Sequence, residues 1–483
     1  MSVQHTDTSL HDLVVAHWLT ALEYEDPEPQ DDWFDFGGDS LGAVQLLGRL
    51  EREGIVADIG EFFRTPTLES LVRLAGRFQP AHGAAGPAPH NTWAGAELPL
   101  TPTQLYTVLA DGTTRDWHND HLTVQLCEHA DRERVDRAVR TLALAHPALT
   151  ARFTVADGRW TQQVLPAEQR SIPVVAVPVK GHEDIGPVED AVRDRGTRFD
   201  IARGEVSVAL VWEDGSRPIA LTLLFHHLCA DGHSADVLQQ DIVAALHDTA
   251  DTVPAEDNYA PWLARLAERT AGRPTVVHTG PQDEEIAFPV SGLRHTTLHL
   301  ETDGLTSREI APAILAAMSR AAQDQPDARA RRLDITWHGR DAIPGWPPLA
   351  TTVGWFSQLR RLQLPSGGAW TVPDALRALE AFEQDHEAFV TGDSATSGLL
   401  TEPAALYLNY RGSLRGTLYA PVRDCLPLDA DFGPQASPDA TTPYHLRCVA
   451  DRVDGGIRLG IKYRPDSPLA ARVIESLRAG VER

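Results

Sequence analysis

Two histidines and an aspartate gather in the segment FHHLCADG, residues 225–232. His226 and His227 end an apolar run that predicts a strand, and Asp231 and Gly232 precede a pattern typical of a helix. Because the ordinary pKa of histidine is about 6.5, its side chain exchanges protons near neutral pH. The segment therefore predicts general acid–base chemistry. His227 and Asp231 also suit a metal pair, but the sequence offers no obvious third ligand nearby.

A serine at the start of a helix forms a second candidate site, in GGDSL at residues 37–41. The two glycines permit a tight approach of the backbone, and Asp39 precedes Ser40 directly. The free N–H groups and the positive dipole end of a helix N-terminus favour a phosphodiester at this place. A serine here is also a common helix cap. The residues alone leave the attachment site and the cap as alternatives.

The elements around these segments predict an α+β protein with a separate helical unit. Residues 1–78 have helical periodicity at 10–22, behind a possible Ser9 cap, at 41–53, and after Thr65 or Thr67. Residues 79–96 are rich in Ala, Gly and Pro and predict a linker. Beyond it we expect helices at 132–145, 235–246, 310–322 and 373–389 and strands at 206–212, 219–226 and 333–337. The length of this region favours two subdomains.

Composition excludes several classes of function. Lys plus Arg is 43 and Asp plus Glu is 68, a net charge of −25, which disfavours nucleic acid and anionic membranes as partners. The four cysteines are far apart and form no CxxC pair, so we expect neither a disulfide framework nor a zinc ribbon. The chain shows no secretory signal and no apolar run of about 18 residues. We expect a cytoplasmic monomer without a bound metal.

Residues 1–78 resemble the peptidyl carrier domain of non-ribosomal peptide synthetases. The resemblance rests on a helix, a long loop, the segment WFDFGGDSL and two further helices. It implies a four-helix, all-α fold in which Ser40 carries a 4′-phosphopantetheine arm, flanked by Asp39 and Leu41. Leu41 and the exposed side of its helix would face partners. A phosphopantetheinyl transferase would attach the arm. An adenylation domain or upstream module would load it, because the sequence contains no adenylate-forming motif.

The remainder resembles the condensation-domain superfamily of the same synthetases, through HHLCADG and the segment PLTPTQ at residues 99–104. The resemblance implies two chloramphenicol-acetyltransferase-like α/β subdomains in a V shape, 97–270 and 271–483, with His227 inside a tunnel between them. His227 would handle a proton, and His226 would be an orienting core histidine. Asp231 would form a structural ion pair with Arg340. Gly232 would allow a tight turn beside the tunnel.

Three segments resemble the epimerisation branch of this superfamily: TWHGRD at 336–341, TTVGWFSQL at 351–359 and LYLNYRGSL at 406–414. That branch has a second proton-transfer residue, a glutamate, where this chain has Thr336. It also continues after HHxxxDG as VSWR, where this chain has HSAD. Asp334 lies two residues before Thr336, on the same side of a strand, and is a possible substitute.

Three hypotheses about activity therefore stay open at the sequence level. The first is acyl transfer that depends on His227 and forms an amide or an ester. The second is epimerisation of the carrier-bound residue with Asp334 or a water as the second group. The third is a non-catalytic platform that presents the carrier-bound substrate to a separate tailoring enzyme.

Overall fold

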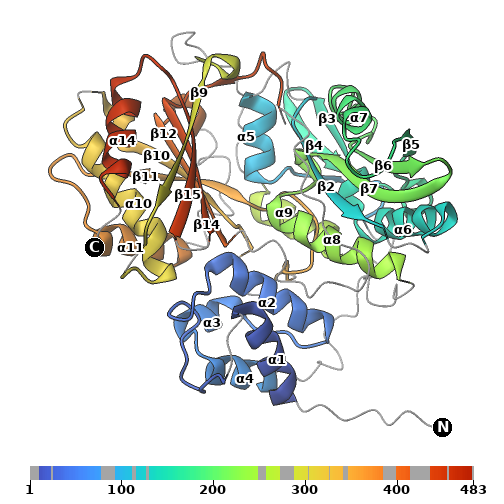
Figure 1. The fold of residues 1–483 in the computed structure, drawn as a ribbon, viewed down its shortest axis with the longest axis horizontal. Coiled ribbons are helices and arrows are strands. Elements are labelled where there is room, and N and C mark those ends of the chain that lie inside the picture. The colour runs from blue at the N-terminus through green and yellow to red at the C-terminus, as the bar shows by residue number, and fades with distance from the viewer. Residues whose placement is uncertain are drawn as a thin grey trace.

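The computed structural model describes residues 10–480 apart from several segments. These are 23–25, 78–92, 111–115, 127–129, 248–256, 272–287, 303, 326, 341–345, 347, 385–398, 414–435 and 454–455. Within the described residues the fold is mixed α+β, as predicted, with a helical domain followed by two sheet-containing halves (Figure 1). None of the described helices is both long enough and apolar enough to span a membrane.

Four helices make up the first domain: α1 (Leu10–Leu22), α2 (Ser40–Arg52), α3 (Ile59–Arg64) and α4 (Leu68–Arg77). Trp18, Trp33 and Phe62 meet edge to face at its centre, with 5.3 Å between the centroids of the two indoles. The predicted helices at 10–22 and 41–53 are confirmed, the second displaced by one residue. Thr67 rather than Thr65 caps α4, because its hydroxyl accepts the Ser70 N–H. The proposed Ser9 cap lies outside the described residues.

The first half contains a four-stranded sheet in the order β2-β7-β6-β5 and a three-stranded sheet in the order β1-β4-β3. Its strands are β1 (Glu97–Leu98), β2 (Asn119–Gln125), β3 (Arg152–Ala156), β4 (Arg159–Gln163), β5 (Val174–Pro178), β6 (Ser207–Asp214) and β7 (Arg217–His226). Its helices are α5 (Pro102–Ala110), α6 (Arg132–Ala145), α7 (Gly186–Gly196), α8 (Gly232–Leu246) and α9 (Tyr259–Thr270). The predicted helix at 132–145 is confirmed at both ends. The predicted helix at 235–246 starts three residues earlier, since Asp231 caps it.

The second half contains a six-stranded sheet in the order β11-β10-β12-β14-β15-β9 and the pair β13-β8. Its strands are β8 (Phe288–Pro289), β9 (Arg294–Leu300), β10 (Arg332–Trp337), β11 (Gln358–Gln363), β12 (Leu406–Ser413), β13 (Thr441–Thr442), β14 (Leu446–Val453) and β15 (Gly456–Tyr463). Its helices are α10 (Ser307–Ala322), α11 (Val372–Gln384) and α14 (Pro468–Arg478). The predicted helices at 310–322 and 373–389 correspond to α10 and α11, although residues 385–389 lie outside the described part.

The two faces of the six-stranded sheet differ in character. Apolar side chains such as Leu446, Cys448 and Ile461 form a common core with α10, α11 and α14. Since side chains alternate along a strand, Arg447 and Lys462 belong to the opposite face. This polar face is the one that the functional cavity uses.

A segment of the second half packs into the core of the first. Leu349, Val353, Trp355 and Phe356 belong to the same buried cluster as the four-stranded sheet. We call residues 349–357, which precede β11, the crossover segment. The halves are thus linked by packing as well as by the chain. The boundary predicted near residue 270 stays a prediction, because the described chain is interrupted between 272 and 287.

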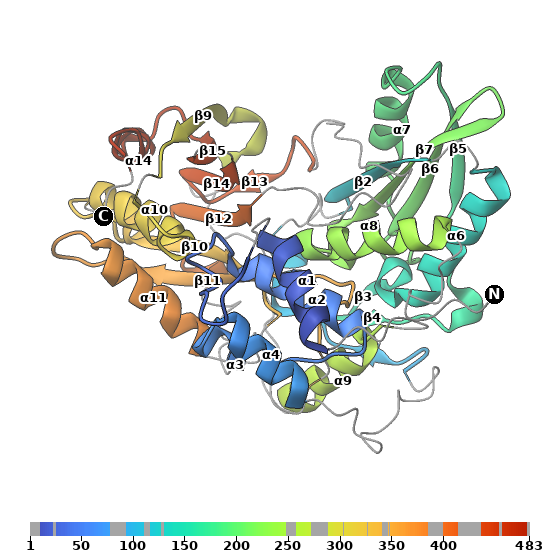
Figure 2. The same cartoon turned by 60° about the horizontal axis from the view of Figure 1, so that its bottom comes forward.

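The helical domain lies where the two halves meet (Figure 2). Helix α2 contacts β12 of the second half and forms side-chain hydrogen bonds to α8 of the first. The serine at the start of α2 therefore faces the region between the halves.

Candidate active site

Asp39, and not Ser40, is the cap of α2. Its Oδ1 accepts the Gly42 N–H at 2.7 Å, and the Trp33 indole N–H donates to its carbonyl at 2.8 Å. Ser40 is consequently the first helical residue, and its side chain lines a cavity. The sequence left Ser40 as either the attachment site or the helix cap, and the structure gives the cap to Asp39. The glycines have separate reasons: Gly37 has φ of +96°, and a Cβ on Gly38 would lie 2.2 Å from the Trp33 ring.

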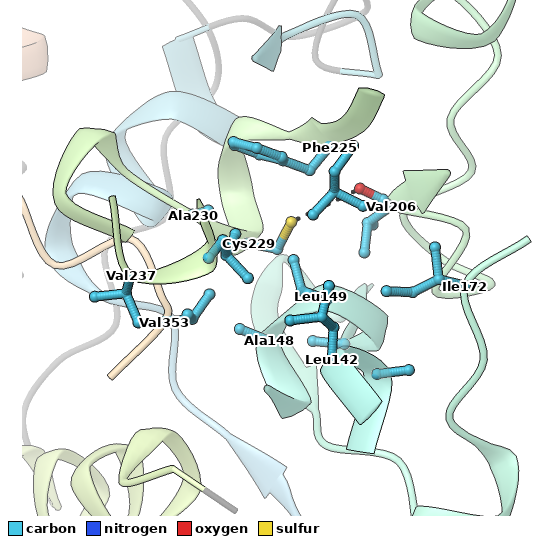
Figure 3. Packing of buried hydrophobic residues seen from close by; sticks show 14 of the residues in the cluster. Leu142, Ala148, Leu149, Ile172, Val206, Phe225, Cys229, Ala230, Val237 and Val353 are labelled. Carbon is cyan, nitrogen blue, oxygen red and sulfur yellow. Dashed lines mark hydrogen bonds between the residues drawn. The ribbon is translucent and has the colours of Figure 1, made fainter. Parts of the chain in front are cut away.

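His227 lies in a 3-10 turn, His227–Cys229, directly after β7. Apolar packing fixes this turn from below: Cys229 is fully buried, and its thiol donates to the Val206 carbonyl at 3.7 Å (Figure 3). Burial raises the pKa of the Cys229 thiol, so the group is a packing residue and not a nucleophile. His226 is also fully buried, and its Nδ1 accepts the Leu228 N–H at 3.0 Å. That placement fits the orienting role expected for His226.

The ring of His227 lines the cavity between two aromatic neighbours. Its centroid lies 4.1 Å from that of Trp355 and 5.1 Å from that of His118. Burial, followed by the repulsion of His118, lowers the pKa of His227 below 6.5. His227 is therefore neutral near pH 7, the form that accepts a proton. Sequence reasoning missed His118; its signal was a histidine in WHND, next to the strand that pairs with the end of β7.

Asp231 connects α8 to the crossover segment. Its Oδ1 accepts from Arg340 at 2.7 Å and from the Ser234 N–H at 2.9 Å. Its Oδ2 accepts the N–H groups of Phe356 and Ser357 at 3.0 and 2.9 Å. Burial alone would raise the pKa of Asp231, but the charges of Arg340 and His233 and the hydrogen bonds from Ser234 lower it to about 2. The predicted pair with Arg340 is present, and its geometry is that of a structural latch.

The prediction that Gly232 forms a tight turn is wrong. Gly232 is the first residue of α8, and a Cβ there would meet nothing within 4 Å. It lines the cavity and leaves space there. The glycine that a close approach requires is Gly339, with φ of +67° and a Cβ position only 1.8 Å from the Phe356 carbonyl oxygen. Gly339 lets the chain that follows β10 pass close to the backbone of the crossover segment.

Thr336 and Asp334 have different surroundings although they lie on one strand. The Thr336 hydroxyl lines the cavity and bonds the Tyr407 hydroxyl at 2.7 Å. Asp334 is 1% exposed, pairs with Arg361 at 2.6 Å and accepts the Tyr444 hydroxyl at 3.0 Å. It is not among the residues that line the cavity. The suggestion that Asp334 replaces the missing second acid/base group is therefore contradicted, since both its oxygens are occupied behind Tyr444.

One cavity of about 590 Å³ joins these groups. Its walls come from all three parts of the chain, including Ser40 of the helical domain, His227 of the first half and Thr336 of the second. A flexible arm on Ser40 therefore has a walled path toward His227. Within the described residues, no group of three acidic, histidine or cysteine side chains is arranged to hold a metal.

Two polar contacts hold α2 against α8 beside this cavity. The Gln45 amide donates to Asp236 at 2.7 Å, and Arg52 pairs with Asp241 at 2.5 Å. Burial raises the pKa of Asp236 to about 7. The side of α2 that was expected to face partners thus contacts α8 in the first half of the condensation-like region. Leu41 lies in α2, but its side chain is outside the described residues.

Two family models match separate parts of the chain. Residues 12–75 match the family described as phosphopantetheine attachment site, and residues 95–273 match the condensation domain family. The chain is a carrier domain followed by a condensation domain of the non-ribosomal peptide synthetase type. The carrier domain accordingly takes a covalently attached 4′-phosphopantetheine. The condensation domain supports an acyltransferase-type or epimerase role.

Curated relatives are much longer than this chain. A linear gramicidin synthase protein of Brevibacillus parabrevis is 25% identical over 388 residues, which are 72% of this chain and 5% of the relative. A surfactin synthase protein of Bacillus subtilis is 24% identical over 390 residues, 73% of this chain and 10% of the relative. The matched part of this chain thus spans a tenth or less of the length of these two relatives.

Solved structures share the fold. The epimerization domain from the third module of tyrocidine synthetase B has a TM-score of 0.60 at 16% identity, covering 80% of this chain and 97% of that domain. A condensation domain described for chain release from the enacyloxin polyketide synthase has a TM-score of 0.52 at 18% identity, covering 92% and 97%. Both branches of the superfamily are thus represented among the structural neighbours.

Proposed function

We propose that this didomain holds an acyl thioester on a 4′-phosphopantetheine attached to Ser40 and transfers the acyl group to an amine or alcohol. The observation that carries the proposal is that Ser40 and a neutral His227 open into the same cavity, while the residues that line it from β10 are Ile335, Thr336 and Trp337, none of them a carboxylate. Acyl transfer needs one proton acceptor, whereas inversion of an α-carbon needs a group on each face. Among the described residues that line the cavity, His227 is the proton acceptor of this proposal, and Thr336 supplies no second one near neutral pH.

When bound, the cofactor supplies a thiol that carries the acyl group as a thioester. The role of His227 is to accept the proton that the attacking nitrogen or oxygen loses. His118 and the buried surroundings keep the imidazole unprotonated for this role, and the Trp355 ring restricts its orientation. The Asp231–Arg340 latch holds the crossover segment that carries Trp355. The hydroxyl of Thr336 is no base near neutral pH but provides a hydrogen-bonding group on the opposite wall.

Epimerisation is the second candidate. It is favoured by the placement of two segments that resemble that branch: Trp355 of one contacts His227, and Tyr407 and Tyr410 of the other line the cavity. Its weakness is the hydroxyl at position 336, together with the occupied carboxylate of Asp334.

The decisive experiment loads Ser40 with an aminoacyl-pantetheine in heavy water and then adds candidate amines and alcohols. Acyl transfer empties the carrier without α-deuterium, and this should depend on His227. Fast His227-dependent deuterium incorporation would overturn the proposal in favour of epimerisation. A loaded carrier that neither exchanges nor discharges until another enzyme is added would identify a platform.

Thr336→Glu tests the same reasoning from the other direction. We expect it to raise α-exchange, because it places a carboxylate where the epimerisation branch keeps one. Thr336→Gln is the matched control, of similar size but without a titratable group. Equal α-exchange in the two variants would show that a carboxylate at this position is not what limits exchange.

A further inference from the structure

The cavity contains one arginine whose charge no described carboxylate balances. Arg447, on β14, lines the cavity and stacks over Tyr407, with its guanidinium carbon 5.1 Å from the ring centroid. The other arginines lining the cavity are paired, Arg308 with Glu380 and Arg411 with Asp451. In the part of the chain that the structure describes, Arg447 forms no ion pair.

The carboxylates that line the same cavity are engaged elsewhere. They are Asp39, which caps α2, Asp231, which pairs with Arg340, Asp236, which accepts from Gln45, and Glu380, which pairs with Arg308. Partly buried guanidinium groups favour planar carboxylates, which they bind through two parallel hydrogen bonds. In a protein of net charge −25, an unbalanced cation on a cavity wall points to an anion that arrives with the ligand.

Arg452, and not Arg447, is the β14 arginine that contacts the loop before the phosphodiester-bearing Ser40. Arg452 marks the Ser40 end of β14, because its guanidinium donates to the Gly37 carbonyl at 2.6 Å. Arg447 lies five residues earlier on the same strand, about 17 Å away at the usual rise per residue. Arg447 therefore belongs to the part of the cavity wall formed by Tyr407 and Thr336.

The neighbourhood of Arg447 also explains why no protein carboxylate is available there. Tyr407, whose ring carries the guanidinium, bonds its hydroxyl to Thr336. Position 336 is where the epimerisation branch has a glutamate, and here it is neutral. The space beside Arg447 thus lacks the negative charge that position 336 would otherwise bring.

We propose that the cavity binds a reactant bearing a carboxylate and that Arg447 holds this carboxylate against the wall formed by Tyr407 and Thr336. The inference deepens the proposed function, on which it rests for the cavity being the substrate site. The carboxylate belongs either to the acyl group on the carrier or to the acceptor. Tyr407 is a positioning residue, since it fixes the guanidinium by stacking.

The test measures binding in the full chain with its arm attached, so that it does not depend on turnover. In the first experiment, the pantetheine arm on Ser40 carries either a glutaryl thioester or the matched thioester that ends in a carboxamide. The rate at which hydroxylamine cleaves each thioester reports how well the cavity shields it. In the second experiment, saturation-transfer NMR compares the binding of free β-alanine with that of β-alaninamide.

In one of the two experiments, we expect the carboxylate compound to be bound or shielded about tenfold or more better than its carboxamide, the size of a charge-assisted hydrogen bond. Arg447→Gln should abolish the preference, and Arg447→Lys should keep part of it. Lys462→Gln is the matched control, because Lys462 pairs in register with Arg447 on β15 but is exposed and outside the cavity lining. It removes the same charge and should leave the preference intact.

Two results would overturn the inference: no carboxylate preference in either experiment, or an equal loss in Arg447→Gln and Lys462→Gln. Failure of the proposed function is a separate observation. If the carboxylate preference is present but no acceptor discharges the carrier, the acyl-transfer proposal fails while the carboxylate site stands.

Discussion

Replacing Asp231 by alanine should destabilise the condensation domain far more than an ordinary surface change. Arg340 has a fully buried side chain and would lose its carboxylate partner. The N–H groups of Phe356 and Ser357 would lose their acceptor as well. Breaking a buried pair by removing one partner costs about 3–5 kcal/mol, a large share of the roughly 5–15 kcal/mol that stabilises a domain. At this size of domain the thermal midpoint should fall by roughly 10 °C.

The latch also has a defined pH dependence. The folded-state pKa of Asp231 is lowered from its ordinary value of 3.8 to about 2. A depressed carboxylate pKa stabilises the fold above the unfolded pKa, and the contribution disappears as the pH falls from about 4 to about 2. The shift corresponds to about 2 kcal/mol. Asp231→Asn should therefore show a shallower loss of stability than wild type across this window.

The assay is thermal unfolding of Asp231→Ala beside Asp374→Ala. Asp374 forms an exposed ion pair with Arg377 on α11, so its loss should lower the thermal midpoint far less. If the two variants melt at the same temperature, the latch is not structural and the reasoning is refuted. A double variant with Arg340→Met should recover part of the loss, because it removes the unpaired buried charge.

The other predictions concern the arm, the base and the docked carrier. Ser40→Ala should prevent the increment of about 340 Da that a phosphopantetheinyl transferase adds; a retained increment in intact-mass spectra would place the arm elsewhere. Transfer should lose rate as the pH falls through the lowered pKa of His227, below 6.5, and His118→Asn should move this acid limb to higher pH by removing a repulsive neighbour; an unmoved limb would contradict the assignment. Arg52→Gln should weaken carrier docking by about tenfold or more, because Asp241 is fully buried. Small-angle scattering should then give a larger radius of gyration than for the control Arg64→Gln, which changes an exposed residue of α3, and equal radii would count against the contact.

Local chemistry made much of the protein predictable from its sequence. The starts of α2 and α8 are set by contacts between residues three apart, Asp39 with Gly42 and Asp231 with Ser234, although the predicted helices began one and three residues later. The helix at 132–145 was predicted at both ends because its apolar face repeats within the helix itself. Short-range hydrogen bonds and periodicity depend only on residues close together in the chain. The sequence therefore determined both candidate segments and the elements that carry them.

The partners of the site residues were decided only by the tertiary structure. Asp334 had the right type and spacing for a second acid/base group, but Arg361 and Tyr444, far apart in the sequence, occupy its oxygens in the fold. His118 reaches His227 only because β2 pairs with β7, and Arg447 is unbalanced only because every nearby carboxylate is engaged. Burial and charge balance depend on what surrounds a side chain in space, which no spacing along the chain records.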